Sequence, residues 1–343
     1  MNRRKLISIF FIFCFSLISI ISCTQDLKTS YQNQHKNPSE ETIVIGYSEW
    51  AGWLPWAIAD EEGLFKKYNV NVDMKWFSNY LESMEALAAG QLDGNCQTLS
   101  DTISFAADAV NGEAIVLVND YSAGNDKIIV TKNIKKIEDL KGKKVAVEEG
   151  LITDFLLTLA LESKGMNRDD VEIVPLQTSA ATAAFTAGKV DAVGTFPPFW
   201  VTAIKAKDAQ ELISSKAFPG AIPDVLAVSK KLINEQPAKV QALVNTWFDI
   251  MDFIVKYPDK ARQIMAERSG VTIAELELFE KGVKLLTIEE NIQAFKHGND
   301  IKHISFTAKK VSQFMMEIGF IPELPDLTTI FDPQFVQAYA KSL

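Results

Sequence analysis

The sequence is poor in three residue types that often carry chemistry, with three cysteines, three histidines and five arginines in 343 residues. Cys14 and Cys23 lie in or directly after an apolar N-terminal segment, so Cys96 is the only thiol expected in the mature folded chain. An internal disulfide is therefore not expected, and Cys96 is predicted to be a small buried residue. The histidines are all distant from Cys96 in sequence, which gives no support to thiol catalysis.

The sequence also lacks the short motifs of common enzyme classes. It contains no Gly-x-Ser-x-Gly, no phosphate-binding loop and no His/Cys spacing typical of a metal site. We therefore expect a protein that is not an enzyme and has no cofactor and no metal. After the first 22 residues no segment approaches about 18 uninterrupted apolar residues, the length at which a membrane-spanning helix is suspected.

The sequence begins with a short basic segment that is followed by an apolar one. Arg3, Arg4 and Lys5 precede a run from Leu6 to Ile21 that only serines interrupt, and Ser22-Cys23 follows it. This order predicts a lipoprotein signal peptide at 1–22, cleaved before Cys23, which then carries the lipid. The run of about 16 residues is short for a spanning helix, which needs roughly 20. An uncleaved anchor is the alternative, and both place the rest of the chain outside the cytoplasm at a membrane face.

The next segment, 23–42, is rich in Gln, Asn, Lys and Ser and has no apolar periodicity, which is typical of a flexible linker. Removal of the leader leaves 32 basic and 44 acidic side chains, a net charge of −12. This charge argues against nucleic acid or an anionic lipid surface as a partner. The remaining membrane contact is the lipid expected on Cys23.

From Thr42 onward, short apolar strands alternate with helices in two blocks. Strands are expected at 43–47, 70–77, 92–96 and 115–118, and then at 127–131, 144–148, 171–176 and 190–194. This alternation predicts βαβ units, and thus an α/β fold with mainly parallel sheets flanked by helices.

The end of the chain is predicted to return to the first block and then to be mostly helical. A strand is expected at 225–229 and helices at 237–256, 258–269, 273–284 and 307–318. Two chain crossings, near 119–125 and 219–224, then join lobe 1 (43–122 plus 222–343) to lobe 2 (123–221). Two such lobes form a hinged clamp that closes on a ligand.

Several segments, in this order, carry a resemblance to a known family. The chain resembles the solute-binding proteins of the nitrate/sulfonate/taurine ABC importers, a group that includes binders of thiamine-pyrimidine precursors, over about 43–320. The similar segments are Ile45-Gly46-Tyr47-Ser48, 59–68, 86–93, 139–147 and 187–192.

The resemblance implies a two-lobed type II periplasmic-binding-protein fold and delivery of a small molecule to an ABC permease and its ATPase. It also implies a monomer that acts on the periplasmic side of the membrane. A second possibility is a ligand-sensing subunit that signals through a partner and does not feed a permease.

Ligands of such sheets bind where strands end and helices begin. Five loops at these positions, together with the exit of the strand at 115–118, supply the candidate ligand-binding residues. These are Glu49, Trp50, Trp53, Asn79, Gln97, Thr98, Asp101, Asp120, Glu149, Asp154, Phe196 and Pro197.

The composition of these loops indicates the sign of the ligand. They hold aromatic and carboxylate side chains but no Lys or Arg. Aromatic faces and carboxylates suit a cation, whereas a sulfonate or nitrate would be repelled by the carboxylates. We therefore expect a small nitrogen-containing solute, guanidine first among them. The alternatives are an aliphatic sulfonate, taurine, nitrate or a thiamine-pyrimidine precursor. Some of these residues have simpler roles open to them: Asp101 and Asp154 can cap helices, and tryptophans often belong to a core.

Overall fold

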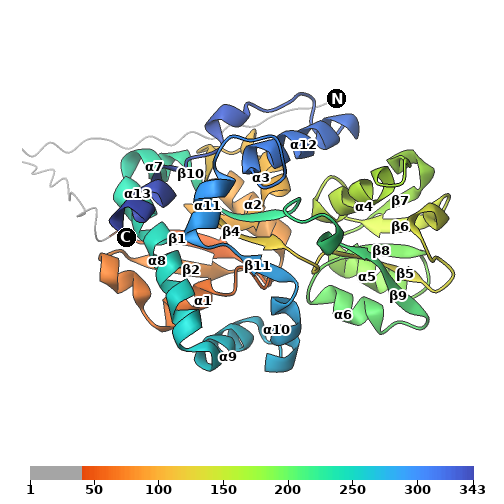
Figure 1. The fold of residues 1–343 in the computed structure, drawn as a ribbon, viewed down its shortest axis with the longest axis horizontal. Coiled ribbons are helices and arrows are strands. Elements are labelled where there is room, and N and C mark those ends of the chain that lie inside the picture. Colours follow the sequence, from red (N-terminus) through yellow and green to blue (C-terminus); the bar gives the residue numbers. More distant parts are fainter. Residues whose placement is uncertain (1–40) are drawn as a thin grey trace, which may run out of the picture. The chain divides into compact units, whose positions relative to one another are not determined.

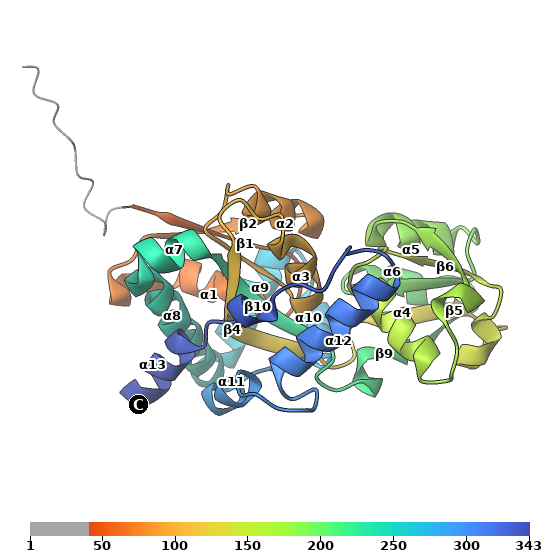
Figure 2. The ribbon, with the colours of Figure 1, turned by 90° about the horizontal axis from the view of Figure 1, so that it is seen from above.

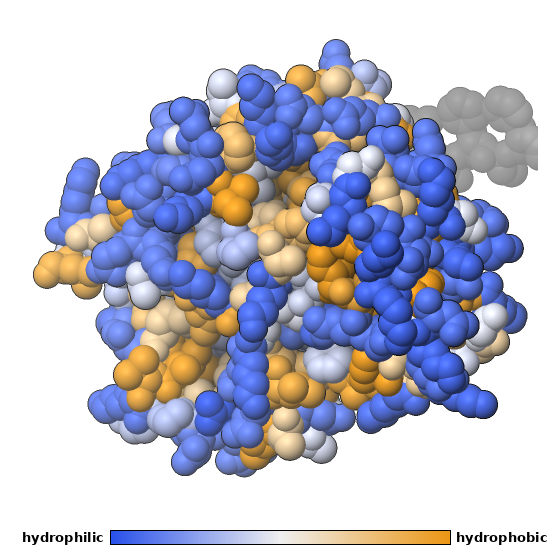
Figure 3. All heavy atoms as spheres, turned by 45° about the vertical axis from the view of Figure 1, so that its right-hand side comes forward, coloured by the Kyte–Doolittle hydropathy of each residue, from blue (hydrophilic) through white to orange (hydrophobic). Residues whose placement is uncertain are grey.

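The computed structural model describes residues 41–343. The predicted signal peptide, the lipid attachment at Cys23 and all but the last two residues of the predicted linker lie outside the described residues. Within 41–343, none of the helices is both long enough and apolar enough to cross a membrane. Figure 3 shows one face, on which hydrophilic residues predominate and smaller hydrophobic areas lie between them.

The first of two sheets contains six strands in the order β11-β4-β10-β3-β1-β2. Only the pairs β1–β2 and β1–β3 are parallel, and the other three pairs are antiparallel. The strands are β1 (Ile43–Tyr47), β2 (Val72–Trp76), β3 (Gly94–Thr98), β4 (Glu113–Ser122), β10 (Pro223–Ser229) and β11 (Val283–Leu285).

The second sheet contains five strands in the order β7-β6-β8-β5-β9. The strands are β5 (Lys127–Thr131), β6 (Lys144–Val147), β7 (Glu172–Pro175), β8 (Ala192–Thr195) and β9 (Ala209–Ser214). β6 pairs in parallel with β7 and β8, whereas β5 is antiparallel to β8 and β9. The prediction of an α/β fold with two lobes is confirmed, but both sheets are mixed and not mainly parallel. The strands that lead into or out of a crossing between the lobes, β4, β5, β9 and β10, are antiparallel to the strands they pair with.

Helices flank both sheets (Figure 1). Those that follow strands of the first sheet are α1 (Trp56–Glu61), α2 (Tyr80–Ala88) and α3 (Leu99–Ala106). Those of the second sheet are α4 (Ile152–Glu162), α5 (Thr178–Thr186) and α6 (Phe199–Ile204). Short 3₁₀ turns are η1 (Leu64–Tyr68), η2 (Ile137–Leu140), η3 (Arg168–Asp170), η4 (Ser215–Ala217) and η5 (Leu327–Thr329).

The C-terminal part is mostly helical, as predicted. Its helices are α7 (Lys230–Glu235), α8 (Pro237–Lys256), α9 (Pro258–Ser269), α10 (Ile273–Glu280), α11 (Ile288–Ala294), α12 (Ile304–Glu317) and α13 (Gln334–Ser342). Proline at the first position starts both α8 and α9, because that position needs no amide donor. The helix predicted at 273–284 is too long, since α10 ends at Glu280 and the chain then adds β11 to the first sheet.

The core of the first lobe is built around aromatic side chains. The indole of Trp56, fully buried on α1, lies 5.1 Å from that of Trp247 on α8, measured between ring centroids. Cys96 on β3 is buried and free, as the sequence predicts. In Figure 2, α12 lies beside α3, and its Phe314 ring is 5.3 Å from Phe155 of α4. One C-terminal helix therefore contacts elements next to both sheets.

The chain passes between the two sheets twice, at 123–126 and at 215–222. The two passages are tied together, because the Ser122 and Ser215 hydroxyls share a hydrogen bond of 2.7 Å and the Gly124 amide donates to Ser215 Oγ. The amide of Ser215 also donates to the Asp126 carbonyl. These contacts fix the positions of Asp126 and of β10, which both bear on the site.

Candidate ligand-binding site

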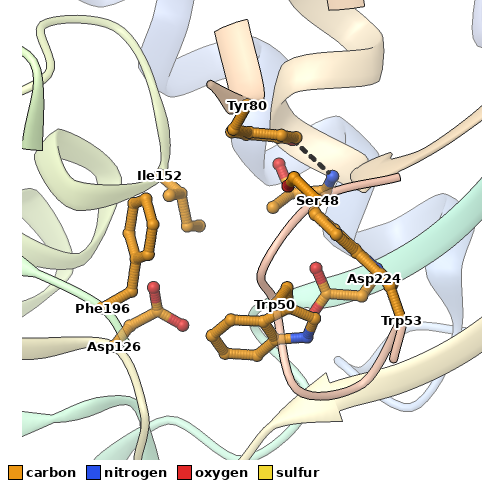
Figure 4. A pocket seen from close by; sticks show the side chains of 9 residues that line it. Ser48, Trp50, Trp53, Tyr80, Asp126, Ile152, Phe196 and Asp224 are labelled. Atoms are coloured by element: carbon orange, nitrogen blue, oxygen red, sulfur yellow. Dashed lines mark hydrogen bonds between the residues drawn. The ribbon is translucent and has the colours of Figure 1, made fainter. Parts of the chain in front are cut away.

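A small cavity lies where loops of the first sheet meet loops of the second (Figure 4). Its volume is about 20 Å³, which by this measure is room for about one water molecule. Its lining comes from both lobes: Ser48, Trp50, Trp53, Tyr80, Thr98, Asp126, Ile152, Phe196 and Asp224. We call it the inner cavity. None of these lining residues is Lys, Arg or His.

The turn after β1 brings two tryptophans into this cavity. The amides of Trp53 and Leu54 both donate to the Trp50 carbonyl, which closes the turn. Trp50 Nε1–H then donates to Asp120 Oδ1 at 3.0 Å. A glycine is required at position 52, because a Cβ there would lie 1.9 Å from Asp120 Oδ2. The close approach of this turn to β4 holds one face of the Trp50 indole at the cavity.

Asp120 and Asp224 are partners on adjacent strands, β4 and β10. Their side chains are 0 % and 1 % exposed, and Oδ2 of each has no hydrogen-bond donor within the described part of the chain. Burial raises the pKa of Asp120 to about 7, and burial together with the charges of Asp120 and Asp126 raises the pKa of Asp224 well above its usual range. The two carboxyl groups lie close enough for one of them to keep its proton and bond to the other, and ionising both without a counter-charge destabilises the ligand-free fold.

A third carboxylate, Asp126, belongs to the first passage between the sheets. It is 2 % exposed, and burial raises its pKa to about 6. Figure 4 shows Asp126 on the same side of the cavity as Phe196, Asp224 on the side of Trp53, and the Trp50 indole between them. Groups whose pKa values are shifted by burial gather at functional sites more often than elsewhere.

A second cavity of about 240 Å³ shares Tyr80 and Phe196 with the first. We call it the outer cavity. Glu49, in the loop after β1, and Glu148, at the end of β6, both line it, as do the first residues of α2 and α5. Burial, with the charge of Glu148 as a smaller cause, raises the pKa of Glu49 to about 7. Each lobe thus contributes one carboxylate to this cavity.

Seven of the twelve predicted residues lie at these two cavities. Trp50, Trp53, Thr98 and Phe196 line the inner cavity, and Glu49 and Asn79 line the outer one. Asp120 lies behind the inner cavity and bonds to Trp50. Asn79 also caps α2, since its Oδ1 accepts from the Leu81 amide.

Three further predicted residues lie inside the lobes and line neither cavity. Gln97 is fully buried and donates from Nε2 to Thr102 Oγ1 and Glu113 Oε2. Asp101 is also fully buried, and accepts from the Tyr80 hydroxyl at 2.8 Å. Pro197 is buried in the loop after β8 and precedes Pro198 with a cis peptide bond. Asp101 therefore holds Tyr80, which lines both cavities, in place. Gln97 and Pro197 lie buried within the fold.

The two remaining residues, Glu149 and Asp154, are bound to an arginine. Arg168 donates from Nε to Asp154 Oδ1 at 3.1 Å and from Nη2 to Glu149 Oε1 at 2.8 Å. Asp154 is fully buried, and its Oδ2 also accepts from the Gly150 amide. The Arg168 guanidinium thus balances one of these two charges within lobe 2, and neither carboxylate lines the inner or the outer cavity. The expectation that Glu149 and Asp154 face a ligand gains no support from this arrangement and stays a prediction.

Sequence reasoning left out several residues that the fold brings to the cavities. They are Ser48, Tyr80, Asp126, Glu148, Ile152, Thr178 and Asp224. Tyr80, Glu148 and Ile152 belong to the predicted loops, so only their orientation was missing. Asp224 ends the predicted crossing at 219–224 and Asp126 directly follows the one at 119–125, while the position of Asp224 opposite Asp120 depends on the β4–β10 register. Within 41–343 no group of three or more His, Cys, Asp or Glu has the arrangement of a metal site.

Residues 36–270 match the model of the NMT1-like family. The chain is 29 % identical over 265 residues to a candidate binding protein of Brucella abortus, covering 75 % of this chain and 81 % of that one. It is 28 % identical over 310 residues to the taurine-binding periplasmic protein of Escherichia coli, covering 86 % and 92 %. The crystal structure of the periplasmic aliphatic sulphonate binding protein of Escherichia coli superposes with a TM-score of 0.70 at 20 % identity, covering 85 % and 92 %. The fold is that of the two-lobed periplasmic binding proteins, and the chain belongs to the NMT1-like family.

Proposed function

We propose that the chain is the extracytoplasmic solute-binding protein of an ABC importer and that it captures a small nitrogen-containing cation between its two lobes, with guanidine as the first compound to test. Family membership and the periplasmic binding proteins among its relatives support the transport role. Fold alone does not decide the ligand, so the argument for a cation comes from the cavity itself.

The supporting observation is the group Asp120, Asp126 and Asp224 beside the Trp50 indole. All three carboxylates are at least 98 % buried. A cation in the inner cavity would supply the missing hydrogen-bond donors and compensate the buried charge. The indole faces would add about 0.5–2 kcal/mol of cation–π attraction.

Taurine or another sulfonate is the second candidate, because relatives bear those names. Taurine has an ammonium group that suits the carboxylates, but its sulfonate would lie near Glu49 or Glu148 in the outer cavity. Nitrate has no cationic group and would be repelled throughout. A thiamine-pyrimidine precursor could use its ring nitrogens at the same carboxylates. A sensing subunit would bind the same ligands, so only its partner would differ.

The decisive experiment is calorimetric titration of the mature protein at pH 8 with guanidinium, methylammonium, taurine, propanesulfonate and nitrate. We expect heat from guanidinium or methylammonium and none from propanesulfonate or nitrate, because only cations complement the buried carboxylates. Tight binding of propanesulfonate or nitrate, with no binding of either cation, would contradict the proposal.

We also propose that lobe 1 (43–122 plus 222–343) and lobe 2 (123–221) rotate about the passages that join them. Two observations support this rotation. Hydrogen bonds join the two passages to each other, and Asp126, which belongs to the first passage, lines the inner cavity. A ligand held by Asp126 and by Asp224 would bind next to both passages and so favour the closed arrangement.

We propose that the protein is anchored to the membrane by a lipid on Cys23. A Cys23→Ser variant loses the only side chain to which the lipid can be attached, so it should move from the detergent phase to the aqueous phase in a detergent partition assay. Its ligand binding should match that of the wild type. A variant that still partitions with the wild type into detergent would show that the leader itself is the anchor.

A further inference from the structure

The inner cavity is too small to hold more than one head group of a ligand. Its volume is about 20 Å³, whereas the outer cavity offers about 240 Å³. The two share the side chains of Tyr80 and Phe196 as walls. A longer ligand with one end among the inner carboxylates would therefore extend past these two side chains into the outer cavity.

The shared walls favour an apolar middle section. Phe196 is 9 % exposed and its ring lies 5.7 Å from that of Phe199, which lines the outer cavity. Tyr80 is held in place on the other lobe, since its hydroxyl donates to Asp101 and accepts from the Thr98 amide. A methylene chain would be buried between such rings at a gain of about 0.8 kcal/mol per CH₂.

The outer cavity is unsuited to an anion. The amides at the starts of α2 and α5 would attract one, but both positions are taken: Asn79 accepts from the Leu81 amide, and Glu148 accepts from the Thr178 amide at 3.0 Å. An incoming anion would meet the carboxylates of Glu148 and Glu49. The second end of the ligand is therefore not a carboxylate, sulfonate or phosphate.

The outer cavity also contains carboxylate oxygens that can accept hydrogen bonds from a ligand. Within the described part of the chain, the carboxylate of Glu49 accepts from its own backbone amide and from no other residue, and this half-buried group faces the charge of Glu148 from the other lobe. Glu148 accepts from the Thr178 amide, and the Thr178 hydroxyl, 2 % exposed, lies beside the same carboxylate. At the inner end, Asp224 Oδ2 has no donor. A cationic N–H group at each end would satisfy these atoms.

We propose that the site takes an elongated dication of the α,ω-diamine class, with one ammonium or amidinium group among Asp120, Asp126 and Asp224 and the other between Glu49 and Glu148. This inference rests on the proposed function and adds the second cationic group. Because Glu49 and Glu148 belong to different lobes, the outer cation would also remove a repulsion that opposes closure.

Calorimetric titration of the mature chain tests this with three series of equal chain length: diaminoalkanes of two to six carbons, 1-aminoalkanes, and ω-amino acids. The best diamine should bind about tenfold or more tighter than the matching monoamine. The matching amino acid should bind more weakly than the monoamine, because its carboxylate meets the two glutamates.

Variants locate the second amine. Glu49→Gln, which removes the charge but keeps the shape, should reduce the advantage of the diamine over the monoamine to about threefold or less. Glu138→Gln, at an exposed glutamate of η2, is the matched control and should keep the full advantage. Glu148→Gln can still accept from the Thr178 amide and provides a second test of the same position.

The outcomes separate this inference from the proposed function. If guanidinium and monoamines bind but diamines gain nothing, the dication inference is overturned and the cation site stands. If neither an amine nor guanidinium binds, both the proposed cation site and the dication inference are overturned. An unchanged diamine advantage in both glutamine variants would overturn the placement of the second amine in the outer cavity.

Discussion

Replacing Asp224 with Asn is expected to weaken the binding of guanidinium or a primary amine by about 100-fold. Asp224 lines the inner cavity with a carboxylate that is 1 % exposed and has no donor on Oδ2. The bound cation would lose a desolvated charge partner, and such losses cost about 2–5 kcal/mol. Asn keeps the shape of Asp, so the loss would report the charge.

The same variant should make the ligand-free protein more stable. Burial and the neighbouring carboxylates raise the pKa of Asp224 above the usual 3.8, and burial raises that of Asp120 to about 7. For a carboxyl group with a raised folded-state pKa, the folded state binds more protons than the unfolded state, so stability falls as pH rises. This destabilisation is absent below about pH 4 and fully developed above pH 7 for Asp120. At pH 8 we therefore expect Asp224→Asn to increase the free energy of unfolding.

Urea unfolding and calorimetry at pH 5 and pH 8 check both effects. The gain in stability should be larger at pH 8 than at pH 5, and the affinity of the wild type for guanidinium should rise over the same range. Asp73→Asn, at an exposed position of β2, is the control and should change neither quantity. Reduced stability at pH 8 together with unchanged affinity would contradict the role given to Asp224.

The sequence predicts much of this fold because local patterns determine it. Apolar strands of about five residues and proline at the first helical position gave β5, α8 and α9 with their observed bounds. The antiparallel pairing was missed because strand direction depends on how the chain returns from the other lobe. No local pattern between 281 and 285 separates the end of a helix from the short edge strand β11.

The site was only partly predictable for a related reason. Trp50, Thr98 and Phe196 lie at or just after the ends of strands, so the rule that ligands bind at strand ends selects them, and all three line the inner cavity. Asp224 is the second residue of β10, and it reaches the inner cavity because β10 runs antiparallel to β4 and lies next to it. The two carboxylates are 104 positions apart in the chain, and only the register makes them neighbours.

Arg168 binds two of the predicted carboxylates, Glu149 and Asp154, and neither of them lines the inner or the outer cavity. It follows Asp154 by 14 residues and forms part of η3 after α4, so nothing in the local pattern assigns it a partner. In the fold its guanidinium contacts both oxygens of Asp154 and one of Glu149. A carboxylate in a candidate loop can be judged only when the cations that fold back onto it are known.

Arg168→Ala should therefore lower the free energy of unfolding by about 2–4 kcal/mol. Removing one partner of a buried pair leaves the other charge uncompensated, which costs about 3–5 kcal/mol at full burial. The Arg168 side chain is 20 % exposed and that of Asp154 is 0 % exposed, so water would recover part of this loss. Urea unfolding at pH 7 measures it.

Two further variants distinguish loss of the pair from loss of any surface arginine. Arg262→Ala removes a 35 %-exposed side chain that pairs with Glu280, and should cost less than about 1 kcal/mol. The double variant Arg168→Met with Asp154→Leu removes both charges, and should recover much of the stability because no buried charge is left alone. If Arg168→Ala costs no more than Arg262→Ala, Asp154 has enough water or backbone partners without its arginine, and its charge would again be available to a ligand.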